Sequence, residues 1–138
     1  MASFNKFNSF VEAIAEKIHN LGSDQLKIAL TAAANAPVAS NTQLSNLTEI
    51  SYTNLSSRNV TTSSSSQTSG TYKLVLADLV LTASGGSVAT FRYVVLYNDT
   101  ATNDELIGWY DYGSNVTLAD GDTFTIDFDG TNGVLTIA

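Results

Sequence analysis

The pattern of the C-terminal half constrains the fold most strongly, because short runs of alternating apolar and polar residues recur there between turn-forming sequences. Tyr72, Leu74 and Leu76 open this pattern on one face of a predicted strand, and the last block is VLTIA at the C-terminus. Gly85-Gly86, Asp120-Gly121 and the segment 130–133 supply turns between the blocks. Strands and turns at this spacing predict a mainly β fold, an antiparallel β-sandwich or barrel-like domain.

The length and composition predict one domain spanning residues 1–138, because 43% of the 138 residues are hydrophobic and one core suits this size. Only 14% of the residues are charged, so Ser, Thr, Asn and Gly must cover much of the surface. The net charge is −7, and every charged residue after Arg92 is acidic. Such a segment is repelled by phosphates and anionic lipid, so we expect neither sequence-specific nucleic acid binding nor membrane binding, and a basic protein surface is the better partner.

The absence of cysteine excludes disulfides, thiolate nucleophiles and cysteine-based zinc sites. No apolar run reaches the roughly 20 residues that span a bilayer, and MASFNKFNSF lacks the apolar segment of a signal peptide. We therefore expect the chain to be made and folded in the cytoplasm.

The N-terminal segment predicts an amphipathic helix over residues 3–21, because apolar side chains recur every three or four residues. These residues are Phe4, Phe7, Val11, Ile14, Ile18 and Leu21. Such a stripe must be buried, either on the chain's own sheet or on another subunit. The first four residues of the stripe are therefore candidate interaction residues.

Residues 25–138 are expected to be mostly antiparallel β, beginning with a half-buried strand that carries Leu26, Ile28 and Leu30. Leu44, Leu47 and Ile50 fit either one helical turn or an irregular edge. The Ser/Thr-rich segment 51–70 is compatible with a flexible linker, but we interpret it as a polar edge strand. It would form a hairpin with the next strand through Thr68, Ser69 and Gly70.

Aromatic residues are concentrated in the segment 91–113, FRYVVLYNDTATNDELIGWYDYG. Alternation places Phe91, Tyr93, Val95 and Tyr97 on one face of a strand, and Arg92, Val94 and Leu96 on the other. Both faces are apolar, so we expect the opposite sheet to bury one and a helix or partner to bury the other. Trp109 and Tyr110 point to opposite faces of the next strand. We interpret these aromatics as core rather than as a carbohydrate platform, and keep Trp109 and Tyr110 as candidate interaction residues.

No catalytic constellation is visible in the sequence. The single histidine, His19, is expected to be solvated at a helix end. Glu16 and Asp24 are its acidic neighbours in sequence, and we do not expect it to lie beside an activated serine in a nucleophilic triad. No phosphate loop or dinucleotide-binding glycine pattern occurs. We therefore expect no enzymatic activity and no cofactor.

The one motif with possible metal chemistry is DFDGTNG at residues 127–133. Asp127, Asp129 and Asn132 are weak calcium candidates, because the full calcium-loop pattern with its terminal glutamate is missing. Asp and Gly also build tight turns, and we interpret the motif as a structural turn.

With these blocks laid out, nearly the whole chain resembles a recurrent small structural protein of tailed bacteriophages. The blocks that carry the resemblance are FNKFNSFVEAIAEKIHNLGSDQLKIALT, APVASNTQLSNLTEI, TYKLVLADLVLTASGGS, FRYVVLYNDT, LIGWYDYGS, TLADGDTFTIDF and NGVLTIA. The resemblance implies a homo-oligomeric virion component, most specifically a head decoration (cement) protein that binds the major capsid protein or other virion subunits. A tail tube or other tail or neck subunit is one alternative, and a glycan-binding module on the virion surface using Trp109, Tyr110 and Tyr112 is another.

Overall fold

The computed structural model describes residues 2–138 and confirms a mainly β, antiparallel fold with one short N-terminal helix. Its elements are β1 (Phe4–Lys6), α1 (Phe10–Ala15), β2 (Leu26–Thr31), η1 (Ala33–Asn35), η2 (Leu44–Asn46), β3 (Asn59–Val60), β4 (Thr62–Thr68), β5 (Thr71–Leu76), β6 (Leu79–Thr82), β7 (Val88–Asn98), β8 (Leu106–Leu118), β9 (Thr123–Ile126) and β10 (Leu135–Ile137). The element η2 is a 3₁₀ turn, so the segment around Leu44 forms one helical turn followed by irregular chain.

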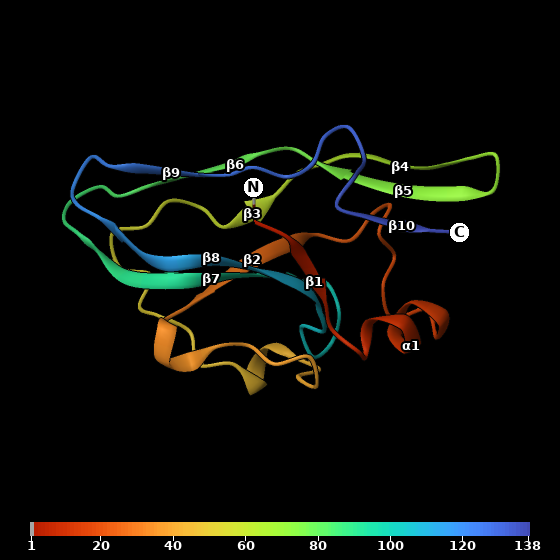
Figure 1. Ribbon diagram of the computed structural model, residues 1–138, viewed down its shortest axis with the longest axis horizontal. Helices are drawn as coiled ribbons and strands as arrows, with labels where there is room; N and C mark the ends of the chain where they lie inside the picture. The colour runs from red at the N-terminus through yellow and green to blue at the C-terminus, as the bar shows by residue number, and fades with distance from the viewer. Residues whose placement is uncertain (1) are drawn as a thin grey trace.

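The strands form two facing layers (Figure 1). One layer is a five-stranded sheet in the order β1-β8-β7-β2-β3. The other contains a three-stranded sheet, β10-β5-β4, and a two-stranded sheet, β6-β9. The arrangement is sandwich-like, and the β4–β5 hairpin projects beyond the five-stranded layer at one end of the molecule (Figure 1).

The main core lies between these layers and contains side chains from both, among them Leu30, Leu74, Phe91 and Val94. A second, smaller cluster lies on the opposite face of the five-stranded sheet, around Val95 and Tyr97. The central strand β7 is therefore buried on both faces, as its apolar pattern predicts.

The second face is covered by the chain's own long connection, rather than by the amphipathic helix predicted for the N-terminus. Leu44 and Leu47 from the long connection between β2 and β3 pack there, together with Phe7, and Figure 1 shows this connection crossing beneath the sheet.

The predicted division of the β7 side chains between the two faces of the sheet is wrong at one residue. Phe91 belongs to the main core with Val94, because the pairing of β7 with β8 is irregular between Phe91 and Tyr93.

The predicted helix over residues 3–21 is wrong in extent. Phe4 lies in β1 and pairs with Tyr110 of β8, and the helix itself spans only α1. Lys17 adopts a left-handed φ of 67°, which cannot continue an α-helix. A short helix is marginal by itself, and pairing along the edge of β8 satisfies the backbone of residues 4–6 instead.

The predicted hairpin between the serine-rich strand and its neighbour is confirmed. Thr68 pairs with Thr71, and the two residues between them, Ser69 and Gly70, have φ values of 51° and 85°. Positive φ at both positions is typical of the tight turns that match the twist of a β-hairpin. Because β4 pairs only with β5 among the strands of residues 2–138, it is an edge strand.

Candidate binding cleft

A cleft of about 1000 Å³ lies beneath the projecting end of the three-stranded sheet. Its walls come from the segment 14–24, the loop 100–105, and residues of β4, β5 and β10. In Figure 1 this is the end of the molecule where α1 lies below β5 and β10. Three parts of the chain that are far apart in sequence therefore meet at one site.

The upper wall of the cleft is apolar because the inner face of the three-stranded sheet continues past the core. Leu74 on β5 is fully buried, and the next residue on that face, Tyr72, is partly buried and pairs with Ile137. Ile137 is 40% exposed, and Ile18 on the opposite wall is 39% exposed. These apolar side chains face a hollow that the chain itself does not fill, which is typical of a binding surface.

The polar wall is organised by Asn98, a fully buried side chain at the end of β7. Its amide nitrogen donates to His19 Nδ1 over 3.0 Å and to Asp24 Oδ2 over 2.7 Å. Its amide oxygen accepts hydrogen bonds from the backbone N–H groups of Thr100 and Ala101. One side chain thus fixes the loop after β7 and the segment 19–24 relative to each other.

This network fixes the tautomer of the neutral His19 ring, which is 5% exposed and stacks on Phe10. Because Asn98 donates to Nδ1, the neutral ring carries its proton on Nε2. That Nε2 atom is buried and has no hydrogen-bond partner among the described residues. Burial lowers the pKa of His19, although the nearby Glu105 and Asp24 carboxylates act to raise it.

The expectation that His19 is solvated is therefore wrong. The sequence carries no signal for its partner, because Asn98 lies 79 residues away and is brought to the histidine only by tertiary packing. The ring is also a poor general base, because the nitrogen with the free electron pair already accepts a hydrogen bond from Asn98.

The rim of the cleft is acidic. Asp24 and Glu105 line it, and Lys17 is the basic residue in its lining. In the same loop, burial and the neighbouring carboxylates of Asp99 and Glu105 raise the pKa of Asp104. The carboxylates contribute part of this rise, and with Asp24 and Glu105 they indicate negative potential at the rim, so the cleft suits a partner that presents apolar and cationic groups together.

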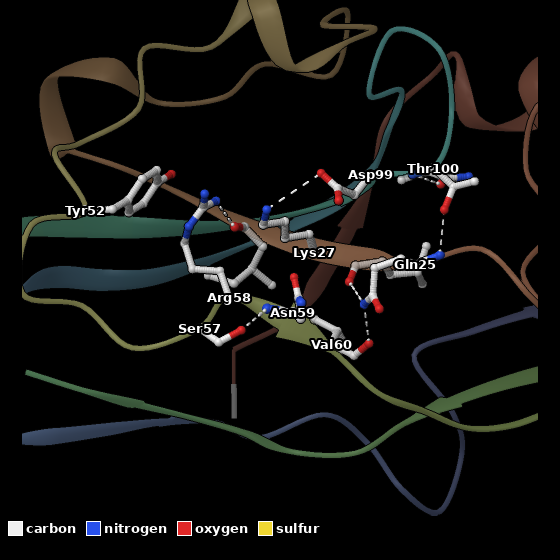
Figure 2. Close-up of polar contacts among 12 residues, drawn as sticks. Gln25, Lys27, Tyr52, Ser57, Arg58, Asn59, Val60, Asp99 and Thr100 are labelled. Atoms are coloured by element: carbon white, nitrogen blue, oxygen red, sulfur yellow. Dashed lines mark hydrogen bonds and ion pairs between the residues drawn. The ribbon is translucent and has the colours of Figure 1, made fainter.

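Polar contacts at the start of β2 hold the acidic loop in place, and Figure 2 shows them around Gln25 and Lys27. The Gln25 N–H donates to Thr100 Oγ1 over 2.8 Å, and Lys27 Nζ lies 3.7 Å from Asp99 Oδ1. The Gln25 side chain also donates to the Val60 carbonyl of β3. The cleft wall is thereby connected to β2 and to the edge strand β3 of the five-stranded sheet.

Backbone groups at the outer edge of β2 form hydrogen bonds with side chains as well as with β3. Arg58 donates to the Ile28 carbonyl over 2.7 Å and lies 3.7 Å above the Tyr52 ring (Figure 2). The Tyr52 hydroxyl accepts from the Leu30 N–H and donates to Glu49, and burial followed by the Glu49 contact raises the pKa of Tyr52. The chain therefore satisfies this sheet edge internally.

The predicted interaction residues do not form one surface patch. Phe4 packs on Tyr110, which is 5% exposed, and Phe7 is fully buried against Trp109 with ring centroids 4.6 Å apart. These two aromatic pairs belong to opposite faces of β8, as predicted for Trp109 and Tyr110. Of the remaining two, Val11 is 53% exposed on α1 and Ile14 lines the cleft.

The calcium candidates lie in a turn whose oxygen atoms are already engaged. Asp129 Oδ1 accepts from the N–H groups of Thr131 and Asn132, and Asp129 Oδ2 accepts from the Asn132 side chain. These contacts, with Asn132 the largest contributor, lower the pKa of Asp129. Asp127 is exposed, and residues 2–138 contain no cluster of three or more acidic or histidine side chains placed to hold a metal ion.

Comparison with protein-family models, curated proteins and solved structures finds no match for this chain. Within the described residues, no helix has the length and apolar character needed to cross a membrane.

Proposed function

We propose that this protein is a non-enzymatic virion structural protein of a tailed bacteriophage, most specifically a capsid decoration protein that binds between capsomers. The observation that carries the proposal is the open cleft, with exposed Ile18 and Ile137 on its walls and an acidic rim. Apolar surface bordered by charge is the usual composition of a protein-docking site. The resemblance of the sequence to phage structural proteins supplies the specific assignment.

The chemistry of the cleft supports binding rather than turnover. His19 Nδ1 accepts a hydrogen bond from the Asn98 side chain, and His19 Nε2 is buried. The ring is therefore not placed to move a proton to or from a ligand. Side chains held this rigidly suit recognition, because little conformational entropy is lost when a partner docks.

The charge of the cleft favours a basic partner surface. Asp24 and Glu105 on the rim would attract lysine or arginine side chains of a shell protein, while Ile18 and Ile137 would bury apolar ones. A decoration protein present in many copies stabilises a shell through such modest contacts, because each copy can join several subunits.

Location in purified particles tests the proposal. We expect mass spectrometry to find the protein in mature virions and immunogold labelling to place it on heads. Labelling of tails would assign the tail or neck alternative instead. Absence from particles, with the protein free in the lysate, would overturn the virion assignment altogether.

A pair of substitutions tests the role of the cleft. Ile18→Asp places a charge on the cleft wall, and we expect it to lower the number of copies per particle. Val80→Asp is the matched control, because Val80 is 51% exposed on β6 and does not line the cleft. Equal occupancy of the two variants on particles would contradict the assignment of the cleft as the docking site.

A further inference from the structure

The outer edge of β4 is an open sheet edge without the usual protection. The strand has the sequence TSSSSQT, and the whole segment 59–72 contains no charged residue and no proline. Edge strands generally carry lysine, proline or covering side chains that prevent pairing with another chain. The edge of β2 has such a cover in Arg58 and Tyr52, whereas among residues 2–138 no strand pairs with the outer side of β4.

The register of the hairpin identifies which backbone groups are free. Because Thr68 and Thr71 flank a two-residue turn, they form a hydrogen-bonded pair, and the pairs then alternate along the strand. Ser66 therefore points its backbone N–H and C=O groups toward β5. Ser65 and Gln67 point theirs away from β5, toward the open edge.

We propose that two copies of this chain pair through β4 in antiparallel orientation, about a two-fold axis at Ser66. In this register Ser65 faces the partner's Gln67, and Gln67 faces the partner's Ser65. All the outward N–H and C=O groups of these two residues are then paired, giving four backbone hydrogen bonds between the copies. The two three-stranded sheets become one continuous six-stranded sheet.

The observations favour a second copy over an unrelated chain as the occupant of this edge. The pairing is self-complementary, as a two-fold interface requires, and matching serine and threonine side chains are favourable neighbours across an antiparallel pair. Each copy carries a net charge of −7, and the segment 59–72 lets two such copies approach with no charged side chain at the contact. The hairpin also projects beyond the five-stranded layer, so the neighbouring sheet can reach it (Figure 1).

The pairing would also organise the binding clefts. A two-fold axis perpendicular to an antiparallel sheet keeps the inner faces of both halves on the same side. Ser65 and Tyr72 line the cleft from that inner face, and their hydroxyl groups lie 2.8 Å apart. The dimer would therefore present two clefts on one side of the joined sheet, which allows bivalent attachment to a repeating surface.

A cysteine cross-link tests the register directly, because the natural chain has no cysteine and any disulfide must join two copies. In the proposed dimer Ser66 is a non-hydrogen-bonded pair with the partner's Ser66, and such pairs have Cα atoms about 4.5 Å apart, within the range of a disulfide. We expect Ser66→Cys to form a covalent dimer under mild oxidation roughly tenfold faster or more than Ser114→Cys, which places a thiol at an exposed position of β8.

A proline substitution tests the same edge without removing the hairpin. Ser65→Pro deletes an N–H group that points outward, so the pairing of β4 with β5 is retained. Sedimentation velocity at increasing concentration should show a monomer–dimer equilibrium for the natural chain and a monomer throughout for this variant, with unchanged far-ultraviolet circular dichroism. A natural chain that stays monomeric, or equal cross-linking rates for the two cysteine variants, would overturn the proposal. The experiment uses the purified chain alone, so its result is independent of the proposed virion function.

Discussion

Asn98 Nδ2 lies 3.0 Å from His19 Nδ1, and this contact joins two segments that are 79 residues apart in sequence. The same amide nitrogen lies 2.7 Å from Asp24 Oδ2. The polar wall of the cleft is thus held from one buried side chain at the end of β7. The shape of this wall therefore depends on the buried hydrogen bonds of Asn98 rather than on the surface residues of the cleft.

Replacing Asn98 with alanine should destabilise the protein strongly. The substitution leaves His19, Asp24 and two backbone N–H groups without their partner, and we expect the free energy of unfolding to fall by about 2 kcal/mol or more. Urea denaturation followed by Trp109 fluorescence measures this change. Asn115→Ala at an exposed position of β8 is the control and should have little effect. Equal losses in the two variants would contradict the importance of the network.

The stability of the protein should decrease as the pH falls through the range in which histidine titrates. Burial lowers the pKa of His19 in the folded chain, whereas the unfolded chain has the usual value of about 6.5. Between these two pKa values the unfolded state binds more protons than the folded state, so the free energy of unfolding rises with pH. His19 therefore makes its full contribution above about pH 6.5, and this contribution declines below that pH until the folded pKa is passed.

Urea denaturation between neutral and mildly acidic pH checks this dependence. His19→Gln removes the titrating group, and its stability should change less over the same range. A natural chain whose stability is constant from neutral pH to below the histidine range would show that the ring is not buried as described.

Substitution of Gly108 should detach the first strand. A Cβ atom at this position would lie 2.6 Å from the Asn5 carbonyl oxygen and would also overlap the Phe4 ring. Gly108→Ala must displace β1 from β8, and we expect a loss of about 1–3 kcal/mol in the free energy of unfolding. Gly130→Ala is the matched control, because a Cβ there meets no atom within 4 Å. Hydrogen exchange of residues 4–6 should increase only in the Gly108 variant.

The turn at Asp129 should contribute to the stability of the fold, and we do not expect it to bind calcium. Asp129→Ala removes the acceptor of three hydrogen bonds within the turn, so it should lower the melting temperature more than Asp127→Ala at an exposed position. We expect calcium to leave the melting temperature of the natural chain unchanged, because the Asp129 oxygens are occupied. A calcium-dependent rise that Asp129→Ala abolishes would restore the metal-site hypothesis.

The aromatic segment 91–113 shows which structural features side-chain alternation predicts and which it does not. Alternation correctly predicts that Trp109 and Tyr110 face opposite sides of β8, because side chains alternate in any extended strand. It misplaces Phe91, because an irregularity in strand pairing is set by the partner strand and leaves little trace in the local pattern.

The sequence by itself determined the β class, the hairpin at Ser69-Gly70 and the double burial of β7, because turn chemistry and side-chain alternation act between near neighbours. Only the tertiary structure decided that Phe4 joins a strand edge, that His19 is buried on Asn98, and that a cleft remains open beside Ile137. These features depend on contacts between segments that are distant in the chain. Local preference near the N-terminus favoured a helix, and the unpaired edge of β8 gave the same residues a more complete set of backbone hydrogen bonds.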